Sequence, residues 1–126
     1  MPDPELLGGE QRSNMKLELL HIADCPNTNA TRRLLNETLR ELGLAEEIRE
    51  IEVSDSLQAE ALSFPGSPTI RVDGIDVEAG LPPNGNGLSC RIYSIDGKPQ
   101  AAPTREMIRR AIRSALSRAA TEVKRA

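Results

Sequence analysis

The spacing of hydrophobic positions alternates between two periods along the chain, and each change of period marks a predicted element. Residues 16–22 (KLELLHI) are largely apolar with partial alternation, which is typical of a buried strand. In residues 27–42 the apolar positions recur at intervals of three and four, which predicts an amphipathic helix that ends before Gly43. Residues 47–53 (EIREIEV) return to alternation and predict a second strand.

Turn-forming residues divide the middle of the chain into a short helix and a hairpin. Ser54 or Asp55 is the expected cap of the short helix, and residues 64–68 (FPGSP) end it. Residues 69–78 (TIRVDGIDVE) hold two β-rich runs on either side of an Asp-Gly pair. Two such runs joined by a two-residue Asp-Gly turn predict a β-hairpin.

The last third of the chain completes the predicted order of elements. Residues 89–95 (SCRIYSI) are interpreted as a further strand or an extended segment, and helical spacing from Thr104 predicts a final helix. The resulting order, β-α-β-α-β-β-α, predicts an α/β fold with a mixed central sheet flanked by helices. We expect the first two strands to be parallel, because a helix joins them, and the hairpin to be antiparallel. Residues 1–14 are rich in proline, glycine and polar groups, so a flexible N-terminal tail is expected before one domain at residues 15–126.

Composition narrows the range of partners. The chain of 126 residues has one Tyr, one Phe and no Trp, which argues against base-stacking platforms for nucleic acid. Its net charge of −3 gives no reason to expect a polyanionic partner. Because no apolar run reaches the length of a membrane span and no signal peptide is visible, we expect no membrane partner and a cytoplasmic location. In a reducing compartment, two cysteines favour reactive thiols or a metal pair over a structural disulfide.

Three short motifs, taken with this order of elements, resemble the thioredoxin-like superfamily. Cys25-Pro26 stands at the predicted strand-to-helix junction, and Ser67-Pro68-Thr69 precedes the third strand. The segment TIRVDGIDVEAG is similar to the glutaredoxin pattern in which a strand, an Asp-Gly turn and a second strand end on a glycine. SPTIRVDG and LSCRIY also resemble segments of small bacterial thioredoxin-like proteins labelled as related to alkylmercury lyase. The resemblance covers most of the chain.

The resemblance implies a particular site and one departure from it. It implies that the Ser67–Pro68 bond is cis, that Pro68 faces the active-site cysteine, and that the backbone of Ser67 forms an edge on which an extended thiol substrate pairs. Members that exchange disulfides carry C-x-x-C, whereas residues 25–28 here read C-P-N-T. Thr28 therefore excludes dithiol chemistry within this motif and leaves a monothiol route. The substrate-binding residues expected from the resemblance are Pro26, Ser67, Pro68 and Thr69.

The position of Cys25 favours a reactive thiol. At a helix start, unpaired backbone N–H groups and the positive end of the helix dipole both stabilise a thiolate. Pro26 suits the first helical position because it has no N–H to lose, and the hydroxyl of Thr28 can turn toward the sulfur. The negative charge of the adjacent Asp24 opposes ionisation. We therefore predict a modestly lowered pKa for Cys25 and assign Cys25 and Thr28 to catalysis; the alternative is a partly buried, inert thiol.

Cys90 has two predicted positions. If residues 75–78 (IDVE) form the fourth strand, the chain returns to the active-site edge and Cys90 comes close to Cys25. If residues 89–94 (SCRIYS) form it instead, Cys90 begins that strand at the far end, too distant to bond Cys25. The tight Asp-Gly turn favours the first arrangement, in which the two sulfurs could form a reversible disulfide or hold Hg(II), Cu(I) or Zn(II). An unpaired Cys90 packed into the sheet is the alternative.

Three functions fit these residues. In the first, Cys25 reacts with a disulfide, a glutathione adduct or an electrophile, and Cys90 resolves the product; no cofactor is needed beyond glutathione or a soft metal ion. In the second, Cys25 and Cys90 bind mercury and Asp24 donates the proton in cleavage of an organomercurial. In the third, a non-catalytic thioredoxin-fold module uses the edge formed by Ser67 and Pro68, or its basic last helix, to dock a partner protein or a metal. The oligomeric state is not predicted.

The remaining polar side chains are expected to be structural. His21 is the only histidine and lies late in the first predicted strand, so a tetrahedral zinc site is not expected. Asp73, Asp76 and Glu78 lack the spacing of a calcium loop and are expected to be turn and surface residues.

Overall fold

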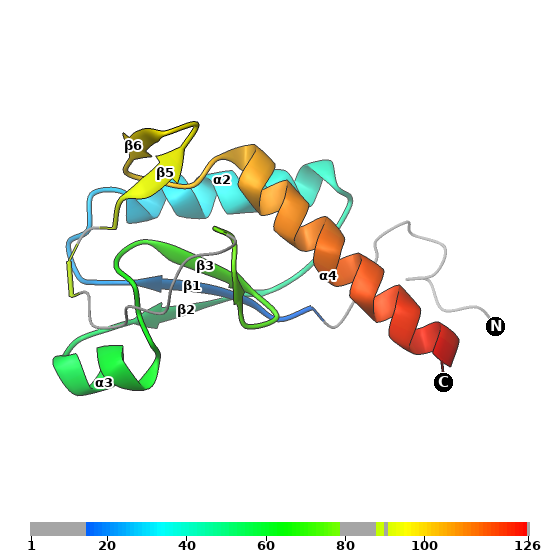
Figure 1. Ribbon diagram of the computed structural model, residues 1–126, viewed down its shortest axis with the longest axis horizontal. Coiled ribbons are helices and arrows are strands. Elements are labelled where there is room, and N and C mark those ends of the chain that lie inside the picture. Colours follow the sequence, from blue (N-terminus) through cyan, green and yellow to red (C-terminus); the bar gives the residue numbers. More distant parts are fainter. Residues whose placement is uncertain (1–14, 79–87, 90, 126) are drawn as a thin grey trace.

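The computed structural model describes residues 15–78, 88–89 and 91–125, which form an α/β structure (Figure 1). Their secondary structure follows the predicted order, with one further hairpin before the last helix. The elements are β1 (Leu17–His21), α2 (Thr28–Glu41), β2 (Ile48–Glu52), α3 (Ser56–Ala61), β3 (Thr69–Val72), β4 (Ile75–Asp76), β5 (Tyr93–Ile95), β6 (Lys98–Gln100) and α4 (Arg105–Arg125).

Four of the strands form one mixed sheet in the order β2-β1-β3-β4. β1 runs parallel to β2, with Leu17 opposite Ile48. β3 runs antiparallel to β1, and β4 runs antiparallel to β3. The predicted parallel first pair and antiparallel hairpin are both confirmed. β1 therefore lies inside the sheet, and its carboxyl end leads directly toward Cys25.

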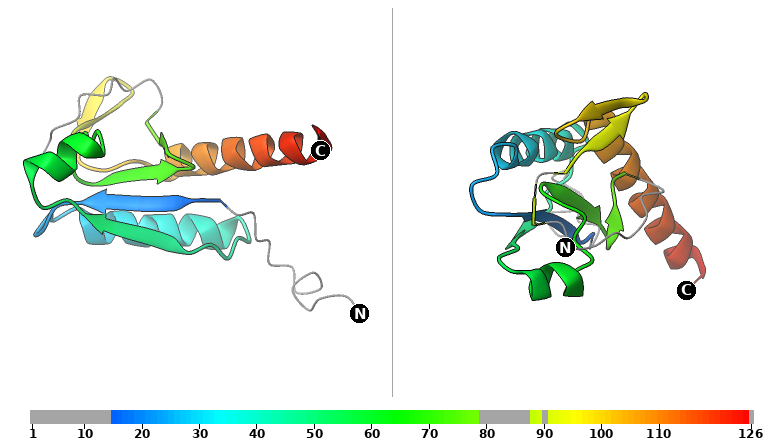
Figure 2. Two further views of the ribbon diagram at one scale, coloured as in Figure 1. Left: turned by 90° about the horizontal axis from the view of Figure 1, so that it is seen from below. Right: turned by 60° about the vertical axis from the view of Figure 1, so that its left-hand side comes forward.

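Helices cover both faces of this sheet, with α2 and α4 on one side and α3 on the other (Figures 1 and 2). Leu17 and Leu19 of β1 belong to the larger core, together with buried residues of α2, β3 and α4. Leu20, on the opposite face, packs in a smaller core with Phe64 and residues near α3. A strand that is covered on both faces carries apolar side chains on both, which explains why Leu17, Leu19 and Leu20 depart from the strict alternation of a half-exposed strand.

The start of α2 differs from the prediction. Its N-cap is Asn27, so Pro26 lies before the helix and is not its first residue. The N–H of Thr28 donates to the carbonyl of Cys25 at 3.3 Å, which closes a turn over residues 25–28. Proline suits the second position of such a turn because its fixed φ matches the required backbone angle. The fixed φ of Pro26 thus shapes the turn that carries the thiol.

Helix α4 begins as the sequence predicts. The hydroxyl of Thr104 accepts a hydrogen bond from the N–H of Met107 at 3.1 Å and so caps the helix. Arg105 then forms ion pairs with Glu37 and Glu41 of α2, at 2.8 and 2.6 Å. These pairs fasten α4 to the C-terminal half of α2. In the part of the chain that the structure describes, no helix has the length and apolar character needed to cross a membrane.

The hairpin of β5 and β6 was not predicted. Its turn, Asp96-Gly97, has φ values of 53° and 77°, close to the 53° and 81° of the predicted turn Asp73-Gly74. The second strand includes Pro99, which is unusual within a strand and concealed the pattern. Because β5 pairs with β6 and not with the main sheet, the arrangement in which residues 89–94 supply the fourth strand is wrong.

Candidate functional site

Cys25 lies at the corner between β1 and α2 and is partly exposed. Asp24 immediately before it is exposed and adopts a left-handed backbone conformation, with φ of 59°. This conformation turns the chain out of the strand and into the turn that precedes α2. Solvent surrounds the carboxylate of Asp24, which weakens the effect of its charge on the neighbouring thiol.

The loop before β3 supplies the second part of the site. The Ser67–Pro68 peptide bond is cis, as predicted, and Ser67 is fully buried. The hydroxyl of Ser67 accepts a hydrogen bond from the N–H of Ile22, at the end of β1, at 3.1 Å. Residues that are 45 positions apart in sequence are thereby joined next to Cys25. Because this bond uses an acceptor position of the Ser67 oxygen, the hydroxyl proton remains free to be donated.

Several polar groups near Cys25 act on the pKa of its thiol. Burial raises the pKa of the Cys25 thiol, but hydrogen bonds outweigh this effect and leave the pKa below its ordinary value. The pKa is lowered by the hydroxyls of Ser67 and Thr28 and by the backbone N–H groups of Asn27 and Thr28. A hydrogen bond to the charged form of an acid favours ionisation. The predicted direction of the shift is therefore confirmed, with Ser67 as a donor that the sequence did not reveal.

The hydroxyl of Thr28 is the group near Cys25 that depends most on the ionisation of the thiol. Thr28 is 5% exposed, and its Oγ1 has no hydrogen-bond partner of regular geometry among the described residues. It nevertheless stands close enough to Cys25 to lower the pKa of the thiol. A buried hydroxyl without a partner costs free energy. The hydroxyl of Thr28 therefore gains most when the sulfur is ionised and can accept a hydrogen bond from it. Thr28 thus complements the thiolate more than the thiol.

The backbone of Ser67 is already paired within the chain. Its N–H donates to the carbonyl of Ser89, and its carbonyl accepts from the N–H of Arg91, both at 2.8 Å. This is the edge on which the resemblance implied that an extended substrate would pair. Such a substrate would have to displace the bonds that Ser89 and Arg91 make.

Arg91 was overlooked in the sequence and is the most buried charged side chain near the site. Its side chain is 2% exposed and forms a two-pronged pair with Asp76, at 2.7 and 2.8 Å. It also bonds Glu78 at 3.1 Å and Thr69 Oγ1 at 3.0 Å, and lies 4.1 Å from the ring centre of Tyr93. Burial lowers the pKa of Arg91, but the bonds to Asp76 and Glu78 and the charges of its neighbours raise it overall. The guanidinium therefore stays charged.

The expectation that Asp76 and Glu78 are turn and surface residues is wrong. Their side chains are 18% and 14% exposed, and both neutralise Arg91. The expectation is right for Asp73, which lies in the hairpin turn and accepts a bond from the N–H of Lys16 at 2.8 Å. Asp76 and Glu78 alternate along a hairpin that looks exposed in the sequence. Their pairing with Arg91, 13 to 15 residues later, depends on the tertiary fold and could not be predicted from the local sequence.

The same segment fixes the rest of the cis-proline loop. Tyr93 is fully buried, and its hydroxyl donates to the carbonyl of Pro68 at 2.6 Å. Thr69 Oγ1 donates to the carbonyl of Gly66 at 2.6 Å while it accepts from Arg91. Gly66 has φ of +131°, and a Cβ there would lie 2.9 Å from the Cβ of Arg91. Glycine is required at this close approach.

The sequence predicted Cys90 as the partner of Cys25 in a disulfide or a soft-metal pair. Cys90 itself lies outside the described residues, so the predicted Cys25–Cys90 disulfide or soft-metal pair stays a prediction. Within the described ranges, no group of three or more histidine, cysteine, aspartate or glutamate side chains is arranged to hold a metal. His21 contacts the carbonyl of Ile22 at 3.2 Å and lies 3.6 Å from Glu50, which fits its expected structural role.

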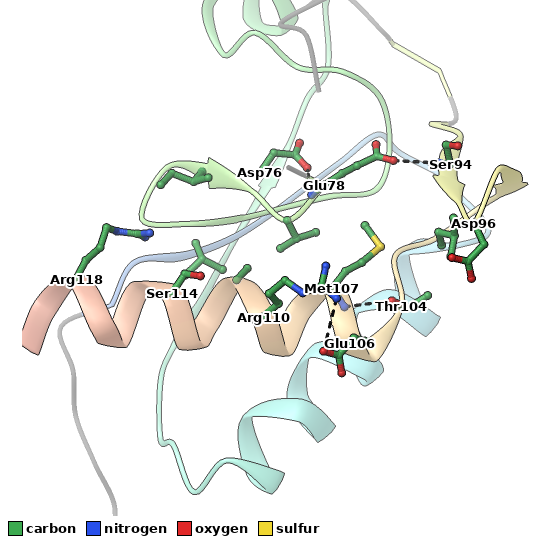
Figure 3. A pocket seen from close by; sticks show the side chains of 15 residues that line it. Asp76, Glu78, Ser94, Asp96, Thr104, Glu106, Met107, Arg110, Ser114 and Arg118 are labelled. Carbon is green, nitrogen blue, oxygen red and sulfur yellow. Dashed lines mark hydrogen bonds and ion pairs between the residues drawn. The ribbon is translucent and has the colours of Figure 1, made fainter. Parts of the chain in front are cut away.

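A separate cavity of about 620 Å³ lies between the two hairpins and α4 (Figure 3). Met107 and Arg110 of α4 line one side, and Asp76 and Glu78 line the other. Neither Cys25 nor Ser67 is part of its lining. The cavity therefore meets the thiol site only indirectly, through the two acids that hold Arg91.

Comparisons with known proteins add no assignment: no family model, no curated protein and no solved structure matches the chain. The proposal for the function of this chain therefore rests on the geometry around Cys25.

Proposed function

We propose that the chain is a thioredoxin-like thiol protein whose Cys25 thiolate attacks disulfides or thiol adducts. The observation that carries this proposal is a partly exposed thiol at the corner between β1 and α2, where nearby hydroxyl and backbone N–H groups lower the pKa of Cys25. Thiolates, not thiols, are the nucleophiles in such exchange. The buried hydroxyl of Thr28, which has no regular partner among the described residues, supports the proposal further, because it gains most when the sulfur is charged.

The arrangement of elements supports the thioredoxin-like part of the proposal. A parallel pair, β1 and β2, an antiparallel hairpin next to β1, and a final helix follow the order that the resemblance implies. The cis bond before Pro68 is a second point of agreement. The hairpin of β5 and β6 is an addition to that order, inserted between the main sheet and α4.

The proposed reaction begins with the formation of a mixed disulfide. The Cys25 thiolate attacks one sulfur of a disulfide R–S–S–R′, so that a Cys25–S–S–R disulfide forms, the S–S bond of the substrate breaks and R′S⁻ leaves. Cys90 then attacks the Cys25 sulfur of this mixed disulfide, which forms a Cys25–Cys90 disulfide and releases RS⁻. In the alternative route, one glutathione attacks the Cys25 sulfur and releases RS⁻, and a second glutathione then displaces the Cys25 thiolate and leaves as glutathione disulfide. The substrate disulfide gains two electrons, and either the Cys25–Cys90 pair or two glutathione molecules supply them. Groups that stabilise the Cys25 thiolate also make Cys25 a better leaving group when the second glutathione displaces it.

The test uses the fact that the chain has two cysteines. In Cys90→Ser only Cys25 remains, and in Cys25→Ser only Cys90 remains, so each variant is the matched control of the other. Each folded variant is mixed with an aromatic disulfide that releases a coloured thiol. We expect fast release from Cys90→Ser and slow release from Cys25→Ser. Slow release from both, at the rate of an unstructured cysteine peptide, would remove the proposal.

A second measurement identifies how the intermediate is resolved. Wild-type protein and Cys90→Ser are each converted to the Cys25 mixed disulfide and followed by mass spectrometry. If Cys90 resolves the intermediate, wild type loses the adduct and becomes two mass units lighter than the reduced protein, whereas Cys90→Ser retains the adduct until glutathione is added. Equal lifetimes in both proteins would assign resolution to glutathione alone.

A further inference from the structure

A buried cation joins the segment after Ser89 to the loop that carries Ser67. The side chain of Arg91 is held by Asp76 and Glu78, and its backbone N–H donates to the carbonyl of Ser67 at 2.8 Å. Asp76 and Glu78 therefore hold the side chain of Arg91, and the backbone of Arg91 bonds the loop at Ser67. The charged or titratable groups that face the guanidinium are Asp76, Glu78 and Tyr93.

Arg91 and Tyr93 restrain the loop at each residue from 66 to 69. Arg91 closes against Gly66 and bonds Ser67 and Thr69, while Tyr93 bonds Pro68. The hydroxyl of Ser67 in turn accepts a hydrogen bond from the N–H of Ile22, at the end of β1. The place of the Ser67 hydroxyl beside the end of β1, three residues before Cys25, thus depends on where Arg91 and Tyr93 hold the loop.

We propose that Arg91 is a positioning residue for Cys25, which holds the Ser67 hydroxyl in the place where it donates to the sulfur. Arg91 does not touch the reacting atoms and acts through Ser67. A donor that moves by about 1 Å loses much of its bond, since hydrogen bonds weaken steeply outside their normal distance and angle. The inference rests on the proposed function in one respect, that Cys25 is the reacting thiol.

A purely structural role for Arg91 makes a different prediction. Loss of a buried cation leaves Asp76 and Glu78 without their partner, so stability falls in either case. If Arg91 only adds stability, the variant that still folds keeps the pH profile of Cys25 reactivity. If Arg91 positions Ser67, the profile moves to higher pH even in the folded protein.

The experiment uses the full chain in the Cys90→Ser background, where Cys25 is the sole thiol. Arg91→Met removes the cation and retains much of the side-chain volume, and Arg91→Lys keeps a charge without the two-pronged geometry. Asp76→Asn is the second route to the same effect if Arg91→Met does not fold, because it weakens the anchor at nearly unchanged shape. The control is Arg105→Met, which removes an arginine from the ion pairs between α2 and α4. Circular dichroism establishes that each variant is folded.

The readouts are the rate of alkylation by iodoacetamide and the ultraviolet absorbance of the thiolate, both followed across pH. We expect Arg91→Met to alkylate about threefold or more slowly at neutral pH, with its profile shifted upward, since one charged hydrogen bond is lost. We expect Arg91→Lys to lie between Arg91→Met and the parent, and Arg105→Met to match the parent.

The inference is overturned if folded Arg91→Met and Asp76→Asn keep the parent profile, or if Arg105→Met shifts it as much. Failure of the proposed function gives a different result. In that case the Cys90→Ser parent itself ionises like an unstructured cysteine, before any change is made at Arg91. A parent with a lowered profile and unshifted variants removes the inference and leaves the proposed function standing.

Discussion

Replacing Ser67 by alanine removes one oxygen from the site and tests the donor that sequence reasoning did not find. A hydrogen bond to a charged group contributes about 1.5–3 kcal/mol. Cys25 is partly exposed, so water replaces part of this bond in the variant, and we take a net loss of about 1 kcal/mol. Since about 1.4 kcal/mol corresponds to a factor of ten, the ionisation constant of Cys25 falls roughly fivefold. The pKa of Cys25 therefore rises in Ser67→Ala.

The alkylation rate changes less than the thiolate fraction. A more basic thiolate is a better nucleophile, and the Brønsted slope of about 0.4–0.5 offsets nearly half of the loss on a logarithmic scale. At a pH below the pKa, Ser67→Ala should thus alkylate roughly two- to threefold more slowly. Thermal stability should also fall, because the N–H of Ile22 loses its acceptor.

The assay follows thiolate absorbance against pH in the Cys90→Ser background, with iodoacetamide rates measured on the same samples. Ser114→Ala, an exposed position on α4, is the matched control and should leave both curves unchanged. A folded Ser67→Ala protein whose absorbance curve overlays that of the parent would refute the reasoning, because the hydroxyl would then not act on the thiolate.

Three further predictions follow from the same contacts. Thr28→Val should lower the thiolate fraction of Cys25 without loss of thermal stability, because it removes a buried hydroxyl that has no partner in the described network. The folded-state pKa of Cys25 lies below its ordinary value of 9.0, so the unfolded chain binds more protons between the two values. Urea unfolding should therefore show wild type gaining stability over Cys25→Ser as pH rises through that window, and a constant difference would contradict the shift. Gly66→Ala should cost more than the roughly 1–2 kcal/mol expected for left-handed strain alone, since its Cβ would meet Arg91, whereas Gly43→Ala has open space and should cost only the strain.

The parts of the fold that depend on local sequence were predictable. The hairpin of β3 and β4 follows from Asp73-Gly74 between two β-rich runs, and α2 and α4 follow from helical spacing. The turn Asp96-Gly97 carries the same signal, and attention to that pair would have revealed the second hairpin. Pro99 concealed the following strand, because proline is rare within strands.

The site was predictable only where its residues are neighbours in sequence. Cys25 and Thr28 share one turn, so their relation could be inferred from spacing. Ser67 was named for its backbone, yet its hydroxyl is the group that lowers the pKa of Cys25, because β1 and β3 pair and bring the two loops together. Arg91 gave no signal, since a lone arginine in an apparently extended segment is normally a surface residue.

The most direct test of the central claim compares the labelling rates of the two cysteines in native wild-type protein. A brief, substoichiometric pulse of iodoacetamide at neutral pH, quenched and mapped by mass spectrometry, reports which thiol reacts first; the same pulse in urea gives the intrinsic rate of each. We predict that Cys25 is labelled several-fold faster in the native protein than in urea and faster than Cys90 in the native protein. Native labelling of Cys25 no faster than in urea, and no faster than that of Cys90, would contradict the claim that the fold activates this thiol.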